Sequence, residues 1–527
     1  MFDSLQILET FFKNMTDNSV IQKHIASTAF VLLMMLIVLP VWWKTTEVYR
    51  ASLPYSDIDS LHGVSVTQKA DILLITTEEE DGRVRGPAFQ NVLSKSVMFD
   101  VSLTARTTRD HEADIVENAV TLAEIDEKVG SQLMQGYPGS LAFLEVPSTL
   151  FSETPHVMLG NYRTVYYSTF VPTEDLAAVA VDTVLGEHKM LALVRKLSSS
   201  SHNRPAPSDS ATKRTIGHLD IFLSLLIPQP EFVMASWDIQ TATEQYMEPF
   251  LSSLPINFSV KSQVVYLTPL DIQEGGELTK DKLGLAVNSV ESVLASQSST
   301  NPALNMIVYI PPVESSPMNI KDSPDNSFLI PRWGGVHIHN YVSQDDQNKK
   351  FPLNLQVDMK KVCGVWLGQL RTLLGVEDVK EYETLDLPST GIRQWEQDFQ
   401  LRFRSLENIL DSKSTLSSLA HLLSQIPNIV ISDEIGARVH TAVQKILESS
   451  HLLKLGNLMG SYKESREALV LSETAFFDKS LLKLLYFPDD QKYAIYIPYF
   501  LPVGVPVILS MKSLVKFFKD SKKSKID

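Results

Sequence analysis

The chain has 527 residues, a formal net charge of −15 from 47 Lys and Arg against 62 Asp and Glu, and a mean hydropathy of −0.01. Its length can bury a large core and predicts two or three subdomains. The acidic balance excludes nucleic-acid binding, which needs a concentrated basic face, and it argues against a middle region lying on an anionic lipid surface.

The first apolar island covers residues 25–43, which carry no charge. As a helix rising about 1.5 Å per residue it would reach roughly 28 Å, the thickness of a bilayer core. A cleaved signal peptide is the alternative, but its apolar region is usually about 7–15 residues and is followed by a small-residue cleavage site. This run ends instead in Pro40-Val41-Trp42-Trp43-Lys44. We therefore expect a retained transmembrane helix after a short leader, residues 1–24.

Residues 44–200 are expected to form a first α/β lobe. Apolar strand patterns occupy residues 72–76, 97–103, 141–146 and 156–168, and helical periodicity occupies residues 113–133 and 174–195. The dipeptide Asp81-Gly82, in an acidic stretch, predicts a turn. Residues 198–210, rich in Ser with two Pro, predict an exposed loop.

A second α/β lobe is predicted for residues 201–389, and a helical region for residues 390–492. In the second lobe, strand patterns at 219–227, 263–267 and 306–310 alternate with helical patterns at 241–253 and 283–296. In the helical region, long amphipathic stretches cover 394–424, 433–455 and 461–484, separated by Pro427 and Gly456. The fold class is therefore α/β: mixed lobes followed by a helical bundle.

A second transmembrane helix is predicted for residues 493–511. Pro498, Pro502 and Pro506 recur in it every four residues, with Gly504 among them. Each Pro frees a backbone carbonyl that lipid cannot satisfy. We expect these four residues to pack the span against helices of a partner, with self-association as the alternative.

Charge near the second span predicts the topology. Six lysines follow it in residues 512–527, against three in the segment before it, which places the basic tail in the cytosol. Two spans then place both termini in the cytosol and the bulk in the lumen of the endoplasmic reticulum. Lys525 and Lys523, third and fifth from the end, match a di-lysine retrieval signal; a solvated basic tail is the alternative.

The topology also predicts which of two N-glycosylation sequons carries a glycan. Asn257-Phe258-Ser259 lies on the predicted luminal side, between a helix and a strand, and Asn257 is expected to carry a glycan. Asn14-Met15-Thr16 lies on the cytosolic side and is expected to stay bare.

Catalytic and metal chemistry find little support in the sequence. It contains no G-x-S-x-G, H-E-x-x-H, P-loop or G-x-G-x-x-G motif. Cys363, the single cysteine, shares a helix face with Val362, Trp366 and Leu370, which indicates a core residue rather than a nucleophile. His337 and His339 alternate on a strand pattern, but without a third ligand they are interpreted as ordinary surface or core residues. No cofactor and no metal are expected.

Three segments resemble the phosphatidylinositol-glycan class S family of GPI transamidase subunits. They are residues 40–54, beginning Pro-Val-Trp-Trp-Lys-Thr-Thr-Glu; residues 331–336, Pro-Arg-Trp-Gly-Gly-Val; and residues 486–492, Tyr-Phe-Pro-Asp-Asp-Gln-Lys, leading into the Pro-spaced span. The resemblance implies a non-catalytic scaffold subunit in the endoplasmic-reticulum membrane. It also implies a protease-like catalytic subunit, class T, class U and GPI-attachment subunits as partners, with membrane lipid, including GPI, as a further contact. No catalytic residue transfers with these motifs.

Two other function classes stay open at this point. An independent membrane-tethered luminal hydrolase would need Cys363 as its thiol nucleophile. A cargo receptor cycling from the endoplasmic reticulum would be supported by Lys523 and Lys525 alone.

Overall fold

The computed structural model describes residues 49–152, 154, 156–198, 218–270, 294, 301–341, 352–376, 378–426 and 429–483, with scattered residues of 22–44 and 494–515. The chain falls into two compact units. The larger comprises residues 55–417 and 440–473, and the smaller comprises residues 1–54, 418–439 and 474–527.

The first α/β lobe of the larger unit is built on a mixed sheet with strand order β13-β4-β5-β3-β1-β2. Neighbouring strands are parallel except β4 and β5, which are antiparallel. Its strands are β1 (Gln68–Thr76), β2 (Phe99–Thr107), β3 (Leu141–Glu145), β4 (Val157–Leu159), β5 (Thr164–Tyr167) and β13 (Glu383–Thr384). The single strand expected over residues 156–168 is thus a pair of short strands that reverses at residues 160–163.

Helices cover both faces of this sheet, so the central strands are buried on both sides, as parallel strands require. One face packs against α4 (Glu79–Leu93), α8 (Thr173–Ala178) and α9 (Glu187–Ser198). The other packs against α5 (Asp110–Asn118) and α6 (Leu122–Ile125). Within β1, Ile72 and Leu74 belong to the first cluster and Ile75 to the second.

Helix α4 contradicts the turn predicted at Asp81-Gly82. The helix begins at Glu79 and runs through this dipeptide and through Pro87. The acidic residues 78–80 lie where the helix begins, and negative charge is favourable near a helix N-terminus. Burial of Phe89 and Leu93 against the sheet supplies packing that the local sequence pattern does not reveal.

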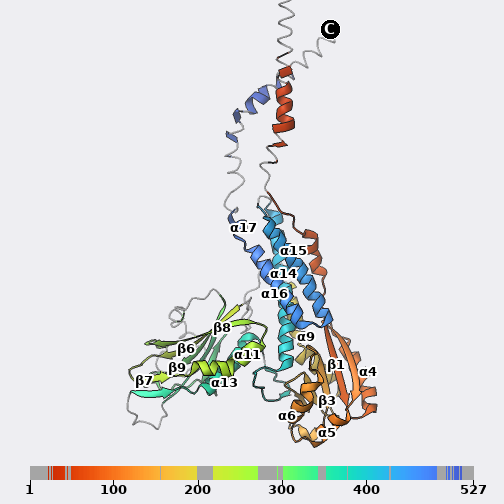
Figure 1. Ribbon diagram of the computed structural model, residues 1–527, viewed down its shortest axis with the longest axis vertical. Coiled ribbons are helices and arrows are strands. Elements are labelled where there is room, and N and C mark those ends of the chain that lie inside the picture. The colour runs from red at the N-terminus through yellow and green to blue at the C-terminus, as the bar shows by residue number, and fades with distance from the viewer. Residues whose placement is uncertain are drawn as a thin grey trace, which may run out of the picture. The chain divides into compact units, whose positions relative to one another are not determined.

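The second α/β lobe has the strand order β10-β11-β9-β6-β8, with β10 antiparallel to β11 and the other neighbours parallel. Figure 1 shows β6, β8 and β9 side by side. The strands are β6 (His218–Ile227), β8 (Asn257–Tyr266), β9 (Ala303–Tyr309), β10 (Ser327–Ile330) and β11 (Gly334–Ile338). A separate parallel pair joins β7 (Val233–Ser236) to β12 (Leu353–Gln356).

Helix α13 (Met359–Leu374) covers one face of this second sheet, together with α10 (Ile239–Ala242) and α11 (Glu248–Ser253). Asp358 caps α13 by accepting hydrogen bonds from the backbone N–H groups of Lys360 and Lys361, and Gly375 ends it with a left-handed φ of 84°. The predicted helix at residues 283–296 lies outside the described residues, except for Leu294, which is buried against the other face.

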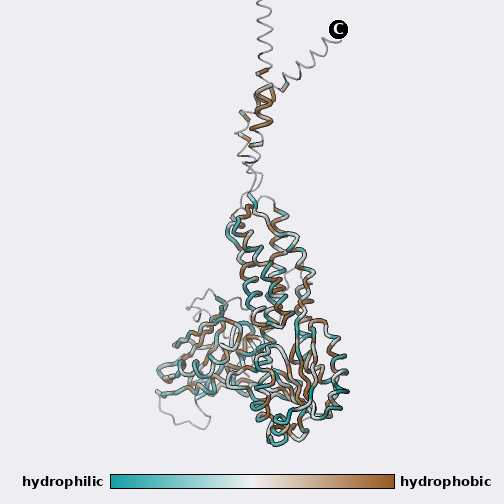
Figure 2. Tube along the Cα trace, turned by 45° about the vertical axis from the view of Figure 1, so that its right-hand side comes forward, coloured by the Kyte–Doolittle hydropathy of each residue, from teal (hydrophilic) through white to brown (hydrophobic). Residues whose placement is uncertain are grey.

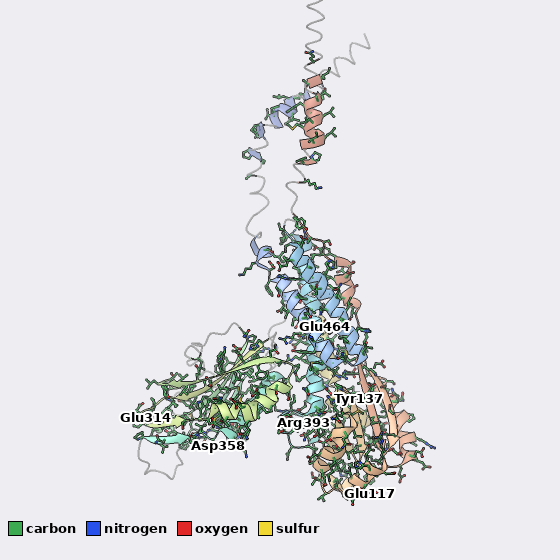
Figure 3. The ribbon with its side chains drawn as sticks, viewed as in Figure 1. Glu117, Tyr137, Glu314, Asp358, Arg393 and Glu464 are labelled. Atoms are coloured by element: carbon green, nitrogen blue, oxygen red, sulfur yellow. The ribbon has the colours of Figure 1, made fainter. Side chains whose placement is uncertain are left out.

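Two long helices follow with bounds close to those predicted, α14 (Gln394–Gln425) and α15 (Asp433–Leu455). The stretch predicted over residues 461–484 is instead two helices, α16 (Leu458–Phe476) and a short α17 (Lys479–Lys483). In the larger unit, Asn408 of α14 donates to Ser465 Oγ of α16 over 3.3 Å. Lys445 of α15 forms ion pairs with Glu464 and Glu467 of α16, at 2.6 and 2.8 Å. Figure 3 labels Glu464. Gly456, with φ 81°, reverses the chain between α15 and α16.

In the smaller unit, an extended segment at residues 49–51 is hydrogen-bonded to residues 431–433, at the start of α15. The backbone N–H of Ala51 donates to Ile431 O over 2.9 Å, and that of Ile431 donates to Tyr49 O over 3.2 Å. The Tyr49 hydroxyl donates to Asp433 Oδ1 over 2.6 Å. Arg438 of α15 contacts Asp478 over 3.0 Å, so segments from both ends of the chain are bonded to residues 418–439.

The mixed α/β class with a helical C-terminal region is confirmed. No helix among the described residues combines the length and apolar composition that a membrane crossing requires. The described residues within 25–43 and 494–515 are largely hydrophobic (Figure 2), but several residues of both predicted spans lie outside the described set. The exposed loop predicted at residues 198–210 lies outside it as well, except for Ser198.

Candidate functional site

Cys363 lies in the core of the second lobe, as its helix pattern predicts. Its side chain is completely buried in the cluster that contains Val362, Trp366 and Leu370. Burial in these apolar surroundings raises the pKa of the thiol to about 12, because the thiolate would lose its hydration. At neutral pH this residue is a protonated thiol with no access to substrate.

The two histidines of the β11 region lie close together, with ring centroids 6.0 Å apart. His337 Nδ1 lies 3.1 Å from Asp325 O, and its Nε2 is buried without a hydrogen-bond partner. Burial, followed by the neighbouring His339, lowers the pKa of His337 to about 4. Among the residues that the structure describes, no three His, Cys, Asp or Glu side chains are arranged to hold a metal ion.

The other predicted site residues occupy separate places. Asn257 is exposed and is the first residue of β8, so the sequon begins within the strand rather than before it. Pro498, Pro502 and Pro506 are exposed in helical stretches, and Gly504 is half-buried. A Cβ added at Gly504 would meet no atom within 4 Å in the described structure. Lys523 and Lys525 lie outside the described residues.

Among the residues that the structure describes, an extensive network of buried polar groups surrounds the first turns of α14. We call it the interlobe joint and define it by six α14 residues together with the groups they bind. The six residues are Trp395, Glu396, Asp398, Gln400, Arg402 and Arg404. Helical spacing divides them between two faces, one toward each lobe.

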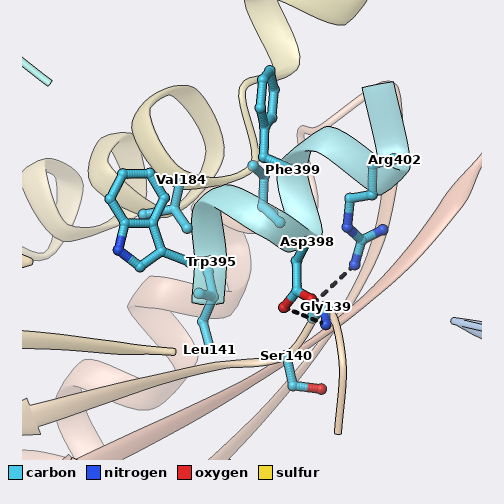
Figure 4. A pocket seen from close by; sticks show the side chains of 9 residues that line it. Gly139, Ser140, Leu141, Val184, Trp395, Asp398, Phe399 and Arg402 are labelled. Carbon is cyan, nitrogen blue, oxygen red and sulfur yellow. Dashed lines mark hydrogen bonds between the residues drawn. The ribbon is translucent and has the colours of Figure 1, made fainter. Parts of the chain in front are cut away.

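Three joint residues bind the first lobe. Trp395 donates from Nε1 to Gly160 O over 3.0 Å. Asp398 accepts from the Gly139 backbone N–H over 2.8 Å and from Arg163 Nη2 over 2.9 Å. Figure 4 shows Asp398 and Arg402 converging on the Gly139 backbone from successive turns of α14. The space that these residues enclose with Leu141 and Val184 is only about 10 Å³, room for one water and no ligand.

Arg402 donates hydrogen bonds to groups at the N-terminal ends of β1 and β3. Its Nη2 donates to Lys69 O over 2.7 Å and to Gly139 O over 2.8 Å, and Nη1 donates to Gln68 Oε1 over 3.2 Å. The guanidinium also lies 5.4 Å from the centroid of the Phe99 ring. Burial lowers the pKa of Arg402 to about 10, partly offset by the charge of Asp398, so the group is a cation at neutral pH.

The opposite face of α14 binds the second lobe through a buried ionic cluster. Glu396 Oε1 accepts from Arg371 Nη2 over 2.9 Å and from Arg393 Nη1 over 3.0 Å. Its Oε2 accepts from the Arg393 backbone N–H over 2.8 Å. Burial alone would lower the pKa of Arg371, but Glu396 and then Asp378 raise it above its usual value.

Two further α14 residues bind carbonyl groups at the C-terminal end of α13. Gln400 donates to Gly375 O over 2.6 Å, and Arg404 donates to Leu374 O over 3.1 Å. Because these acceptors are the last carbonyls of a helix, they have no partner within α13 itself. The joint therefore supplies hydrogen-bond partners to polar groups of both lobes, and α14 connects the two lobes.

A cleft of about 890 Å³ opens beside the joint in the larger unit. Its walls carry carboxylates and cations in alternation, among them Asp182, Lys189, Asp378 and Lys380, with Phe399 at the joint. Lys189 Nζ lies 5.6 Å from the Phe399 ring centroid. Side chains of both charge signs line this cleft, so its walls do not select a ligand of one charge.

The joint was not predicted from the sequence, although a signal was present. Asp398 and Arg402 are spaced i, i+4 in the same stripe as Trp395 and Leu406, which belong to the apolar core. Charges at core positions of an amphipathic helix are costly unless they are paired, so they mark a buried polar contact.

Comparisons with known proteins match one family over nearly the whole chain. The family model described as "Phosphatidylinositol-glycan biosynthesis class S protein" matches residues 29–521. The "GPI-anchor transamidase component PIGS" of Bos taurus is 34% identical over 559 residues, covering 97% of each chain. The Homo sapiens protein of the same description is 34% identical, covering 92% of this chain and 93% of its own. The "GPI transamidase component GPI17" of Saccharomyces cerevisiae is 22% identical over 92% and 91%.

Proposed function

Because this chain belongs to the phosphatidylinositol-glycan biosynthesis class S family, we propose that it is an accessory subunit of GPI transamidase that acts as a scaffold without an active site of its own. The observation that carries this proposal is the 34% identity to a named transamidase component across 97% of both chains. Similarity that covers all parts of the chain in order supports a shared role in the complex.

The described structure supports the scaffold part of the proposal. The single thiol is buried and protonated, so it does not supply the nucleophile of an independent hydrolase. The buried polar groups of the interlobe joint bind backbone carbonyls and oppositely charged side chains. These contacts fix two α/β lobes in one arrangement, which suits a surface for holding other subunits.

The membrane arrangement is part of the same proposal. Residues 25–43 and 493–511 cross the membrane of the endoplasmic reticulum, both termini face the cytosol, and the bulk of the chain is luminal. The lysine-rich tail supports this orientation, and Lys523 and Lys525 act there as a retrieval signal. Asn257, exposed at the start of β8, is then a glycan acceptor in the lumen.

The partners in this proposal are the protease-like catalytic subunit, the class T and class U subunits and the GPI-attachment subunit. The Pro-spaced span supports packing inside a membrane bundle, because carbonyls freed by Pro498, Pro502 and Pro506 need partners that lipid does not offer. The face of the span that carries them would lie against a neighbouring helix or against bound GPI.

Complementation with purification tests the proposal. Cells that lack their own class S subunit are expected to regain GPI-anchored proteins at the surface when this chain is expressed, measured by flow cytometry. A tagged chain should co-purify with the protease-like subunit. The Cys363→Ala variant is the matched control and should restore surface display as well as the unaltered chain. Failure to co-purify, or loss of rescue in folded Cys363→Ala, would refute the accessory role.

A further inference from the structure

A groove of about 690 Å³ lies in the larger unit between the start of β8 and helix α16. One wall is formed by residues 252 and 254–258, which lead into β8 and include Asn257 itself. The volume falls in the range of small-molecule sites, about 300–1,000 Å³. The glycan acceptor is therefore part of the wall of a cavity and does not simply project into solvent.

The other wall is a single face of α16. Met459, Tyr462, Lys463 and Arg466 line the groove, and their i, i+3, i+4 and i+7 spacing places them on one side of the helix. Met459 is 57% exposed although it is apolar, and Tyr462 is half-buried. This face combines an apolar and an aromatic side chain with two cationic ones.

We propose that the N-glycan on Asn257 occupies this groove, with its first sugars packed against Tyr462 and Met459 of α16. The inference rests on the luminal placement proposed above. For attachment, Asn257 Nδ2 loses a proton and bonds to the anomeric carbon of an oligosaccharide, whose lipid diphosphate carrier leaves. The first sugar is then covalently held inside the groove, so its binding to the walls is intramolecular and needs little affinity.

The chemistry of the walls suits a sugar more than a purely apolar segment. A pyranose ring has a face of C–H groups that packs on an aromatic ring, and hydroxyl and acetamido groups at its edge. Phe258 and Tyr462 supply aromatic rings, and the Lys463 ammonium supplies a donor beside them. An apolar peptide would desolvate the Lys463 ammonium and offer it no acceptor.

Beyond Asn257, the sequon is built into the second lobe. The Ser259 hydroxyl donates to Asp220 Oδ1 over 2.6 Å, and Asn257 pairs with His218 in the parallel register of β8 and β6. The acceptor is thus fixed by the sheet and not by a loose loop. A glycan seated on α16 would add a further connection between the second lobe and the helical region, besides the bonds that α14 makes to the end of α13.

Native deglycosylation of the full-length protein measures whether the glycan is seated. We expect peptide-N-glycosidase F to release the Asn257 glycan at least tenfold more slowly from the folded chain than from the denatured chain. Tyr462→Ala should bring the native rate to within about twofold of the denatured rate. Met459→Glu, at a position already 57% exposed, should do the same with little risk to folding. Tyr137→Ala, at an exposed tyrosine that does not line the groove, is the matched control and should leave protection unchanged.

Each other outcome overturns the inference in a recognisable way. A glycan that is present but released at one rate regardless of Tyr462 and Met459 would refute the seating and leave the luminal placement intact. Protection seen only when other subunits are bound would assign the cover to a partner chain. A bare Asn257 in folded, membrane-inserted protein would refute both the seating and the luminal placement, while co-purification with the protease-like subunit tests the accessory role separately.

Discussion

Replacing Glu396 with Ala is expected to be among the most damaging single changes in the chain. The Glu396 carboxylate is 4% exposed and is shared by the guanidinium groups of Arg371 and Arg393, whose side chains are 3% and 5% exposed. Without it, the acceptors that remain for Arg393 among the described residues are neutral, Thr384 Oγ1 and Leu385 O. Arg371 keeps Gly391 O and the carboxylate of Asp378.

Breaking a buried ion pair by removing one partner costs about 3–5 kcal/mol, because a charge remains buried without compensation. We therefore expect Glu396→Ala to lower the free energy of unfolding by about 3–5 kcal/mol, roughly two to three and a half orders of magnitude in the unfolding equilibrium. Glu396→Gln retains an acceptor but loses the charge, and an intermediate loss of about 2 kcal/mol is expected.

Asp378→Ala is the matched control because it removes the other carboxylate of the same arginine. Asp378 lies 2.8 Å from Arg371 Nη2, but its side chain is 74% exposed, so the loss should stay below about 1 kcal/mol. Urea unfolding of the detergent-extracted chain, followed by tryptophan fluorescence and pulse proteolysis, gives the three midpoints. Equal midpoints for Glu396→Ala and Asp378→Ala would show that burial does not set the strength of this cluster.

Three further predictions concern other parts of the larger unit. Gly139→Ala should destabilise more than Gly136→Ala in thermal unfolding: both have φ near 80°, but only at Gly139 would a Cβ lie 2.5 Å from Arg402 Nη2. His337 titrates near pH 4 when folded and near 6.5 when unfolded, so the unfolded state binds the extra proton between these values. Stability should therefore fall by about 3 kcal/mol as pH drops from 6.5 to 4, and His337→Gln should flatten this slope. Cys363 should resist maleimide at pH 7–8 in the native chain and react fully in denaturant; rapid native labelling would contradict its burial.

Long periodic segments were predictable from the sequence because one physical signal dominates each of them. The helices α14 and α15 begin at the predicted residues, and β6 and β9 differ from prediction by a few residues at most. Elements set by tertiary contacts were not predictable. The strand β13 is only two residues long and exists through its pairing with Met158 and Leu159 of β4.

The candidate site was predictable only in part. The helix pattern correctly placed Cys363 in the core, because an apolar stripe directly reports burial. The joint depends on which backbone carbonyls meet Arg402 and Arg404, and these acceptors lie on distant segments that local periodicity does not identify. The groove beside Asn257 likewise joins residues about 200 positions apart, so only the folded arrangement reveals it.

The bond from Arg402 to Gln68 spans 334 positions, which has a consequence for biosynthesis. At about 5–20 residues per second, the ribosome adds Arg402 roughly 20–70 s after Gln68. During that interval the first sheet lacks the helix that covers Leu141 and Phe99, and such high contact order favours slow closure. Until α14 has been synthesised, the apolar residues that it covers stay exposed and can bind chaperones. A chain truncated before α14 would keep this surface exposed, whereas a complete chain buries it.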